Sequence, residues 1–409
     1  MFREMLRPAV HGLRSVLGTH GVGARLAALE ARTAPAAPSS AAAAGEPPPG
    51  LDINVLLHQS RGAYLRAMPP GARRLLSAGC SGNWYFDWIT QTYGPVEEHL
   101  GIEFYTPEPA GLPANVRWIA NTASDMAGVA EASCDLIFSG QNAEHLWPEE
   151  VAGFLLEAAR VTRTGGHVVM DSPNRDITRP LVWSHPEHTI ELTADEISEL
   201  LVLAGFDVTA RRGIWLCRDP RSGRMLPFDP NVADADWSVT ERLLAAHDNL
   251  ADAFIWWVEA VRTDRVPDAA AVHARMAALF AEHWPERVQR LLVPAGRALE
   301  GRADGEWVVM AAGEGGPAFF GPYMPLKAGR YACTWEMEGG TGGGPVARFD
   351  IQARDHDEPL AQHDATGGER EVRLEITLTD TTFGLQFRAL SLGRAGFAVR
   401  RRIRLEQIG

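Results

Sequence analysis

The chain has 409 residues, of which 45% are hydrophobic and 22% are charged, a composition typical of a globular protein with two or three domains. Its 39 Lys and Arg against 52 Asp and Glu give a net charge of −13, which argues against nucleic-acid binding over the whole surface. The four cysteines form no CxxC pair, so neither a zinc module nor a disulfide scaffold is expected. No apolar run reaches the roughly 18 residues of a membrane span, and charges interrupt the first 14 residues, so we expect a cytoplasmic protein without a signal peptide.

The first 50 residues read as an attached segment. Apolar residues three or four apart predict one or two basic helices over residues 2–32. Residues 33–50 are rich in Pro, Ala, Ser and Gly and predict a linker. Two roles are possible for the predicted helices. They contact a membrane surface or a partner enzyme, or they pack on their own protein.

Residues 51–236 alternate short apolar runs with amphipathic segments, which predicts a mostly parallel sheet with helices on both faces. The expected strands lie at 73–78, 99–104, 115–120, 134–139 and 167–171. The expected helices lie at 84–93, 148–161 and 194–206.

The remaining chain divides into two further regions. Residues 237–295 predict a helical extension that includes the aromatic run Phe254-Ile255-Trp256-Trp257. From residue 296 to 409, apolar and polar residues alternate in short runs between Gly-rich turns, which predicts an antiparallel β-sandwich of jelly-roll type.

The segment most relevant to chemistry follows the first expected strand of the alternating region. Gly79, Cys80, Ser81 and Gly82 are small, so backbone N–H groups can approach a ligand there. Glu103 ends the next strand, where an acid can accept hydrogen bonds from both hydroxyls of a ribose. Together, the turn of small residues and Glu103 predict a binding site for a cofactor that contains a nucleoside. The alternative role for Glu103 is that of an exposed carboxylate at a strand end.

In this arrangement the sequence resembles the class I S-adenosylmethionine-dependent methyltransferases. The matching segments are the turn at 79–82, Glu103, SCDLIFSGQNAEHLW (133–147), FLLEAARVTRTGGHVVMDSPN (154–174) and EHTIELTADEISELLVLAGFDV (187–208). The family pattern usually has an acid near Ser77 and glycine at Ser81, and this chain departs from it at both positions. A dinucleotide-binding dehydrogenase would need a third glycine where Trp84 stands.

The resemblance implies a Rossmann-like fold with a mostly parallel seven-stranded sheet. It also implies S-adenosylmethionine as cofactor and S-adenosylhomocysteine as product. Ser124 or Asp125 is expected beside the adenine. Ser139, Gly140 and Gln141 are expected beside the methionine moiety.

Three histidines are candidates for the general base that would take a proton from an acceptor hydroxyl. His145 follows the fourth expected strand, and His185 and His188 follow the fifth. Capping or core hydrogen bonding is the alternative role for each. A divalent metal at His185, His188 and Asp171 is a less favoured reading, because two histidines without a clear third ligand are weak evidence.

Four polar residues are candidates for binding the acceptor, because they lie at the end of the fifth strand or after it, where ligands bind in such folds. They are Asp171, Asn174, Arg175 and Glu187. A turn built on Pro173 is the alternative role for the first part of this loop.

The C-terminal region resembles, less specifically, carbohydrate-associated modules of bacterial polysaccharide enzymes, through the segment GPYMPLKAGRYACTWEM (321–337). Tyr323, Trp307 and Trp335 are candidate sugar platforms, with burial in the core as the alternative. The expected function is therefore O-methylation of a surface glycan or its lipid-linked precursor. A small-molecule methyltransferase and a non-catalytic assembly protein stay open, as does a homo-oligomer.

Overall fold

The computed structural model describes residues 50–181, 185, 187–290, 292–294, 297–298, 307–339, 344–354 and 356–408. The helical segment and linker predicted before residue 50 lie outside these residues. The chain divides into two compact units. One comprises the chain up to Asn142 with Gly153–Leu181 and Leu192–Ala269. The other comprises Ala143–Ala152, Val182–Glu191 and Ala270–Gly409.

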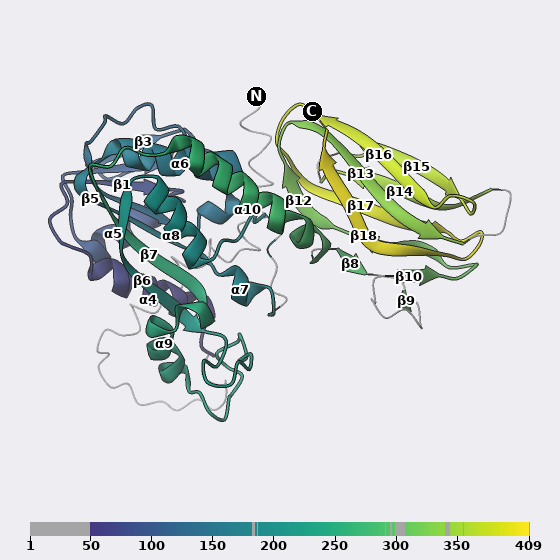
Figure 1. Cartoon of the computed structure of the whole chain (residues 1–409), viewed down its shortest axis with the longest axis horizontal. Coiled ribbons are helices and arrows are strands. Elements are labelled where there is room, and N and C mark those ends of the chain that lie inside the picture. Colours follow the sequence, from purple (N-terminus) through teal and green to yellow (C-terminus); the bar gives the residue numbers. More distant parts are fainter. Residues whose placement is uncertain are drawn as a thin grey trace, which may run out of the picture. The chain divides into compact units, whose positions relative to one another are not determined.

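The first unit is built on a seven-stranded sheet (Figure 1), and its strand order is β3-β2-β1-β4-β5-β7-β6. Strands β1 to β5 pair in parallel, whereas β7 runs antiparallel to both of its neighbours. The strands are β1 (Arg74–Ala78), β2 (Glu98–Ile102), β3 (Val116–Ile119), β4 (Cys134–Gly140), β5 (Thr162–Pro173), β6 (Phe206–Leu216) and β7 (Ala253–Arg262). This arrangement confirms the Rossmann-like, mostly parallel sheet expected from the sequence.

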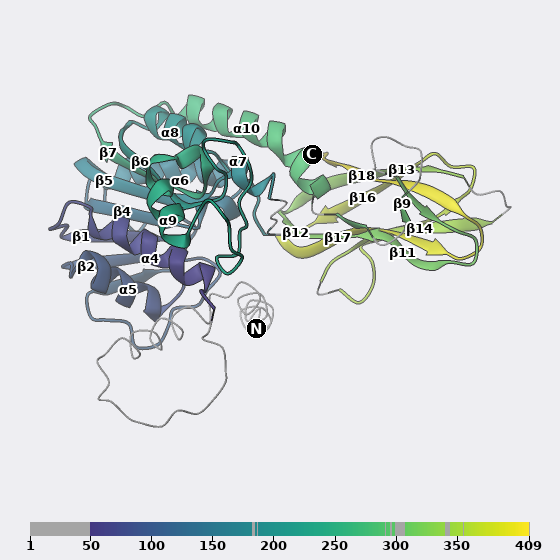
Figure 2. The same cartoon turned by 90° about the horizontal axis from the view of Figure 1, so that it is seen from below.

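Helices lie on both faces of this sheet (Figures 1 and 2). They are α4 (Ile53–Arg66), α5 (Asn83–Tyr93), α6 (Pro148–Val161), α7 (Arg175–Thr178), α8 (Ala194–Leu203) and α9 (Val239–Asp248), with the short 3-10 turn η2 (Leu250–Asp252). A second 3-10 turn, η1 (Ala143–His145), belongs to the second unit. Helix α8 begins with a capping box between Thr193 and Glu196, so two backbone N–H groups at its start are satisfied. Among the described helices, none is long and apolar enough to cross a membrane.

The prediction of a helical extension over 237–295 is wrong in its middle part. Residues 253–262 form β7, which lies between β5 and β6 and is fully buried over its first six residues. A strand covered on both faces reads as a continuous apolar run, and such a run cannot be distinguished from a buried helix by periodicity. Among the described residues of this region, the helical elements are α9, the short 3-10 turn η2 and α10 (Ala269–Arg290).

The second unit contains two antiparallel sheets, which confirms the expected sandwich-type domain (Figure 2). The five-stranded sheet comprises β16 (Glu371–Leu378), β13 (Gly329–Glu338), β18 (Phe397–Gln407), β10 (Trp307–Met310) and β9 (Arg297–Ala298). The six-stranded sheet comprises β15 (Ala361–Thr366), β14 (Pro345–Gln352), β17 (Thr382–Leu392), β11 (Gly315–Phe320) and β8 (Val293–Pro294), with β12 (Pro322–Leu326) paired to β17. Trp335, Phe349 and Phe387 are fully buried members of its core.

Candidate active site

The turn after β1 has a backbone shape that requires glycine. Gly79 has a φ of +79°, and a Cβ at this position would lie 2.5 Å from Oδ1 of Asn142. Its N–H donates to the carbonyl of Ile102 at 2.9 Å, which fixes the end of β1 beside the end of β2. The turn therefore brings bare backbone to the carboxyl edge of the sheet, where ligands bind in open α/β folds.

The rest of the turn leads into the start of α5. Gly82 is the residue before the helix, has a φ of +122°, and provides no side-chain cap for the first N–H groups. Such N–H groups attract anionic ligand atoms. Cys80 is fully buried, where its Sγ lies 3.6 Å from the carbonyl of Ile102 and burial raises the pKa of its thiol. The buried side chain of Cys80 therefore offers nothing to a ligand, whereas Ser81 is partly buried.

Glu103 follows β2 directly. Its N–H donates to the carbonyl of Ile119 at 3.1 Å, so the residue is held where the ends of β2 and β3 meet. Its Oε1 accepts hydrogen bonds from the N–H groups of Tyr105 and Thr106, both at 2.8 Å. The carboxylate therefore orders the following loop and lies at the strand end expected for a ribose-binding acid.

The segment after β4 contains the residues expected beside the methionine moiety. Ser139 is 1% exposed, and its Oγ accepts a hydrogen bond from Asn142 at 3.3 Å. Gln141 has a φ of +54° and donates to Asp171 twice, from its backbone N–H to the carbonyl at 2.9 Å and from Nε2 to Oδ1 at 2.7 Å. Gly140 leaves no room for a Cβ, which would contact Arg61, Phe138 and Asp171.

A buried arginine of α4 completes this network, and the sequence analysis did not identify it. Nε of Arg61 donates to Oδ2 of Asp171 at 2.9 Å, and its guanidinium lies 5.5 Å from the ring centre of Trp88. Burial raises the pKa of Asp171, while Arg61 and Gln141 oppose that change. With both carboxylate oxygens bonded, Asp171 positions the Gln141 loop.

Three buried polar atoms near this network have no hydrogen-bond partner among the described residues. They are Nε2 of His58, Nη2 of Arg61 and the hydroxyl of Tyr85. His58 packs against Trp88 with 4.4 Å between ring centres, and burial lowers its pKa to about 3. Unsatisfied buried groups are costly, so this side of the sheet edge is suited to a polar ligand. His58 and Arg61 lie on the buried face of α4 together with Val55 and Leu65. Polar residues on an otherwise apolar helix face are the sequence signal that could have identified this network.

The segment expected beside the adenine is ordered by its own hydrogen bonds. The hydroxyls of Thr122 and Ser124 lie 3.0 Å apart, and Met126 donates its N–H to Glu157 at 2.8 Å. Asp125 is exposed and accepts a hydrogen bond from the N–H of Ala127 at 3.1 Å. Contact of Ser124 or Asp125 with an adenine stays a prediction.

Two of the predicted acceptor-binding residues have structural partners. Asn174 is 2% exposed, caps α7 through the N–H of Asp176, and donates Nδ2 to the carbonyl of Ala253 at 3.2 Å. Arg175 forms a two-point ion pair with Glu196, at 2.8 and 2.6 Å. Both side chains therefore stabilise the fold, and an acceptor-binding role for either of them stays a prediction.

The three candidate histidines lie together in the second unit. The rings of His185 and His188 stack with centres 4.4 Å apart, and His145 contacts His188 edge-on at 4.8 Å. Burial lowers the pKa of each to about 3, assisted by the neighbouring histidine charges and Arg287. All three are therefore neutral near pH 7.

A buried ion pair holds this histidine cluster. Nδ1 of His188 lies 2.8 Å from Oε1 of Glu191, and Arg287 donates to the same oxygen at 3.1 Å. Arg287 also donates to the carbonyls of His188 and His185, at 2.7 and 2.5 Å. The N–H of Glu187 donates to Nδ1 of His185 at 3.3 Å, and burial raises the pKa of Glu187.

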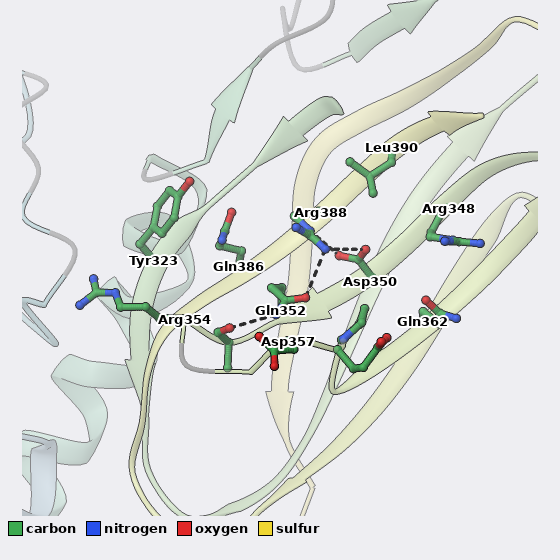
Figure 3. Close-up of a pocket in the computed structure, with 13 residues that line it drawn as sticks. Tyr323, Arg348, Asp350, Gln352, Arg354, Asp357, Gln362, Gln386, Arg388 and Leu390 are labelled. Carbon is green, nitrogen blue, oxygen red and sulfur yellow. Dashed lines mark hydrogen bonds and ion pairs between the residues drawn. The ribbon is translucent and has the colours of Figure 1, made fainter. Parts of the chain in front are cut away.

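A polar depression of about 580 Å³ lies on the six-stranded sheet of the second unit (Figure 3). Arg388 forms a two-point ion pair with Asp350 at 2.6 and 2.9 Å and reaches Gln352 at 3.4 Å. Tyr323 lines the depression, is 36% exposed, and has a φ of +65°, a conformation that is costly for a non-glycine residue. The other two proposed sugar platforms are wrong, because Trp335 is fully buried and Trp307 is 6% exposed.

Comparison with known proteins gives one matching family model, described as "Methyltransferase domain", over residues 76–170. A relative from Mycolicibacterium smegmatis, named "Probable S-adenosylmethionine-dependent methyltransferase", is 32% identical over 204 residues, which are 47% of this chain and 72% of the relative. Relatives with the same description in two strains of Mycobacterium tuberculosis are 31% identical over 41% of this chain. The match spans 61% of the length of these latter relatives.

Solved structures with similarity to this chain include a SAM-dependent methyltransferase from Archaeoglobus fulgidus, which is 17% identical with a TM-score of 0.36. The match covers 50% of this chain and 94% of that one. A 1,6-didemethyltoxoflavin-N1-methyltransferase from Burkholderia thailandensis, solved with S-adenosylhomocysteine, is 17% identical with a TM-score of 0.34. That match covers 51% of this chain and 79% of the other.

Proposed function

The chain belongs to the S-adenosylmethionine-dependent methyltransferase family, and from this premise we propose that it methylates a sugar hydroxyl of a bacterial surface glycan. The acceptor class comprises O-antigen, capsule and related polysaccharides, or their lipid-linked precursors. The methyl donor follows from the family, whereas the acceptor is argued from the second unit.

The described residues of the first unit fit the family's cofactor. When bound, S-adenosylmethionine supplies an electrophilic methyl group on a sulfonium. Gly79 presents bare backbone at the sheet edge, and the uncapped start of α5 adds N–H donors. Glu103 lies at the strand end from which a carboxylate binds a ribose diol. Gln141, fixed by Asp171 and Arg61, orders the loop beside the methionine moiety.

The observation that carries the glycan proposal is the polar depression on the sandwich. Its lining combines paired Arg and Asp side chains, amides and the exposed ring of Tyr323 (Figure 3). Sugars offer many hydroxyl groups for planar hydrogen-bonding side chains and an apolar ring face for an aromatic platform. A small aromatic or amine substrate would need no such second surface.

A histidine is the proposed proton acceptor for the sugar hydroxyl, drawn from His145, His185 and His188. Burial keeps these imidazoles neutral near pH 7, and a neutral imidazole has a lone pair to accept a proton. Orientation by a carboxylate, as Glu191 provides for His188, is a recurring feature of histidine bases.

The proposal is tested by incubating the full chain with methyl-labelled S-adenosylmethionine and a panel of bacterial oligosaccharides, phenols and amines. A methyl ether on a sugar, located by mass spectrometry and NMR, is the expected product. Transfer only to phenols or amines would support a small-molecule methyltransferase instead. Neither transfer nor binding of S-adenosylhomocysteine would support a non-catalytic assembly protein.

A matched pair of variants separates glycan binding from the cofactor site. Tyr323→Ala should raise the KM for a polysaccharide acceptor while leaving the affinity for S-adenosylhomocysteine unchanged. Arg330→Ala removes an exposed side chain from the other sheet of the sandwich and should change neither quantity. An unchanged KM in Tyr323→Ala would contradict binding of the acceptor at the depression.

A further inference from the structure

Two segments of the second unit bring three metal-ligating side chains together. Glu144 and His145 belong to η1, and His188 lies 43 positions further along the chain than His145. One ligand atom from each residue lies within 4.8 Å of the other two. Glu144 is 1% exposed and His188 is 5% exposed, so two of the three groups are buried.

The backbone holds the two segments against each other independently of these side chains. The N–H of Thr189 donates to the carbonyl of Glu144 at 2.6 Å, and its hydroxyl donates to the carbonyl of His145 at 3.3 Å. Arg287 binds the carbonyl of His188 from α10. The three side chains therefore project from a framework fixed by buried hydrogen bonds.

The surroundings of His188 are those of an oriented metal ligand. Oε1 of Glu191 lies 2.8 Å from Nδ1 of His188 and accepts a hydrogen bond from Arg287 at 3.1 Å. Because this oxygen is an acceptor, we assign Nδ1 of His188 as the donor in the contact, which leaves the ring lone pair on Nε2. Histidines that ligate metals commonly donate their second ring N–H to a carboxylate in this way.

From this geometry we propose that Glu144, His145 and His188 bind one divalent first-row transition ion of the zinc class. Two imidazoles and one carboxylate suit such ions and leave a fourth position for water or a substrate oxygen. A shared ion would draw the ligand atoms together to about 3.5 Å from one another, a contraction that side-chain rotation can supply. The ligand set differs from the one considered in the sequence, because both carboxylate oxygens of Asp171 are bonded to Arg61 and Gln141.

Ion binding by this cluster does not depend on the proposed function. If both proposals hold, His145 and His188 serve the ion, and His185 is the member left for proton transfer. That assignment alone rests on the proposed function. His185→Ala should lose methyl transfer and keep ion binding, and full methyl transfer by this variant would overturn the assignment without touching the ion site.

The test uses the untagged full chain after dialysis against a chelator. Titration with Zn²⁺ by calorimetry is expected to show one tight site per chain, and Co²⁺ is expected to produce visible d–d absorption bands at the same stoichiometry. Glu144→Gln and His188→Ala should abolish this site. Glu191→Gln should weaken it by about 10–100-fold, because Glu191 only orients a ligand.

Controls separate this site from general imidazole binding and from misfolding. His363→Ala removes a half-exposed histidine of the sandwich that is paired with Glu369, and should leave the stoichiometry and affinity unchanged. Circular dichroism checks folding, and the Gln variants retain the side-chain volume of the glutamates, so they carry the test if His188→Ala does not fold. The absence of a saturable site in the wild-type chain would overturn the proposal, as would equal binding by wild type, Glu144→Gln and Glu191→Gln.

Discussion

The proposed cofactor cradle of the first unit, which comprises Gly79–Gly82 and the loop after β4, and the histidine cluster of the second unit are built in opposite ways. The cradle is mainly backbone, shaped by consecutive small residues after β1 and by the short loop after β4. The histidines of the cluster come from two separate segments, and a buried ion pair between Glu191 and Arg287 of α10 holds them. A backbone site depends on room and conformation, whereas a side-chain site depends on every buried charge keeping its partner.

The largest expected effect comes from removing the charge that holds the cluster. Arg287→Met leaves Glu191 buried without its cationic partner and should lower the free energy of unfolding by about 3–5 kcal/mol. Urea denaturation measures this difference. Arg330→Met, which removes an exposed ion pair with Glu375, is the control and should have no measurable effect. Equal stability of the Arg287 variant and wild type would show that the cluster does not depend on this ion pair.

The corresponding change in the cradle is Gly79→Ala. Alanine would have to adopt a left-handed backbone conformation there, and its Cβ would overlap Asn142. The free energy of unfolding should therefore be about 2–4 kcal/mol lower than in wild type. Gly71→Ala is a matched control, because Gly71 has a φ of +87° but nothing within 4 Å of an added Cβ. Urea denaturation of both variants separates backbone strain from overlap, and equal losses would contradict the steric argument.

His99, a buried histidine of the first unit, tests whether burial of a neutral imidazole lowers stability at acidic pH outside the histidine cluster. Burial lowers the pKa of His99 from 6.5 to about 4, and Ser77 lies 2.8 Å from its Nε2. Because the unfolded chain binds the proton first, stability is full above pH 6.5 and falls as the pH decreases toward 4. Between pH 7 and pH 4.5, the free energy of unfolding of His99→Gln should decrease by about 2–3 kcal/mol less than that of wild type. Denaturation at both pH values measures it, and an unchanged pH dependence would contradict the shifted pKa.

The smallest expected effect concerns affinity alone. Glu103→Gln keeps an acceptor for the N–H groups of Tyr105 and Thr106 but removes the charge offered to a ribose. Calorimetry should show an affinity for S-adenosylhomocysteine about 10-fold weaker, or about 1.4 kcal/mol, with stability unchanged. Glu97→Gln, an exposed carboxylate paired with Arg73 just before β2, should bind as wild type does. Equal affinity of the Glu103 variant and wild type would remove Glu103 from the cofactor site.

The same contrast explains what the sequence could predict. Strand periodicity and the Gly79–Gly82 turn depend on a few consecutive residues, so the sheet and the tight turn at its edge can be predicted from the sequence. The aromatic run of β7 wrongly predicts a helix, because a strand buried on both faces lacks the alternation of apolar and polar residues. Arg61 and Arg287 escaped prediction, because each acts on residues about 100 positions away, Asp171 and Glu191 respectively. The fold can therefore be predicted from the sequence more completely than the side-chain networks of the two sites.

The most direct test of the central assignment is calorimetric titration of the full-length chain with S-adenosylhomocysteine, in wild type and in Gly79→Ala. The account predicts one binding site per wild-type chain and a marked loss of affinity in folded Gly79→Ala, because the cradle is formed by the backbone at this turn. Absence of binding by the wild-type chain, or full affinity in the variant, would contradict it.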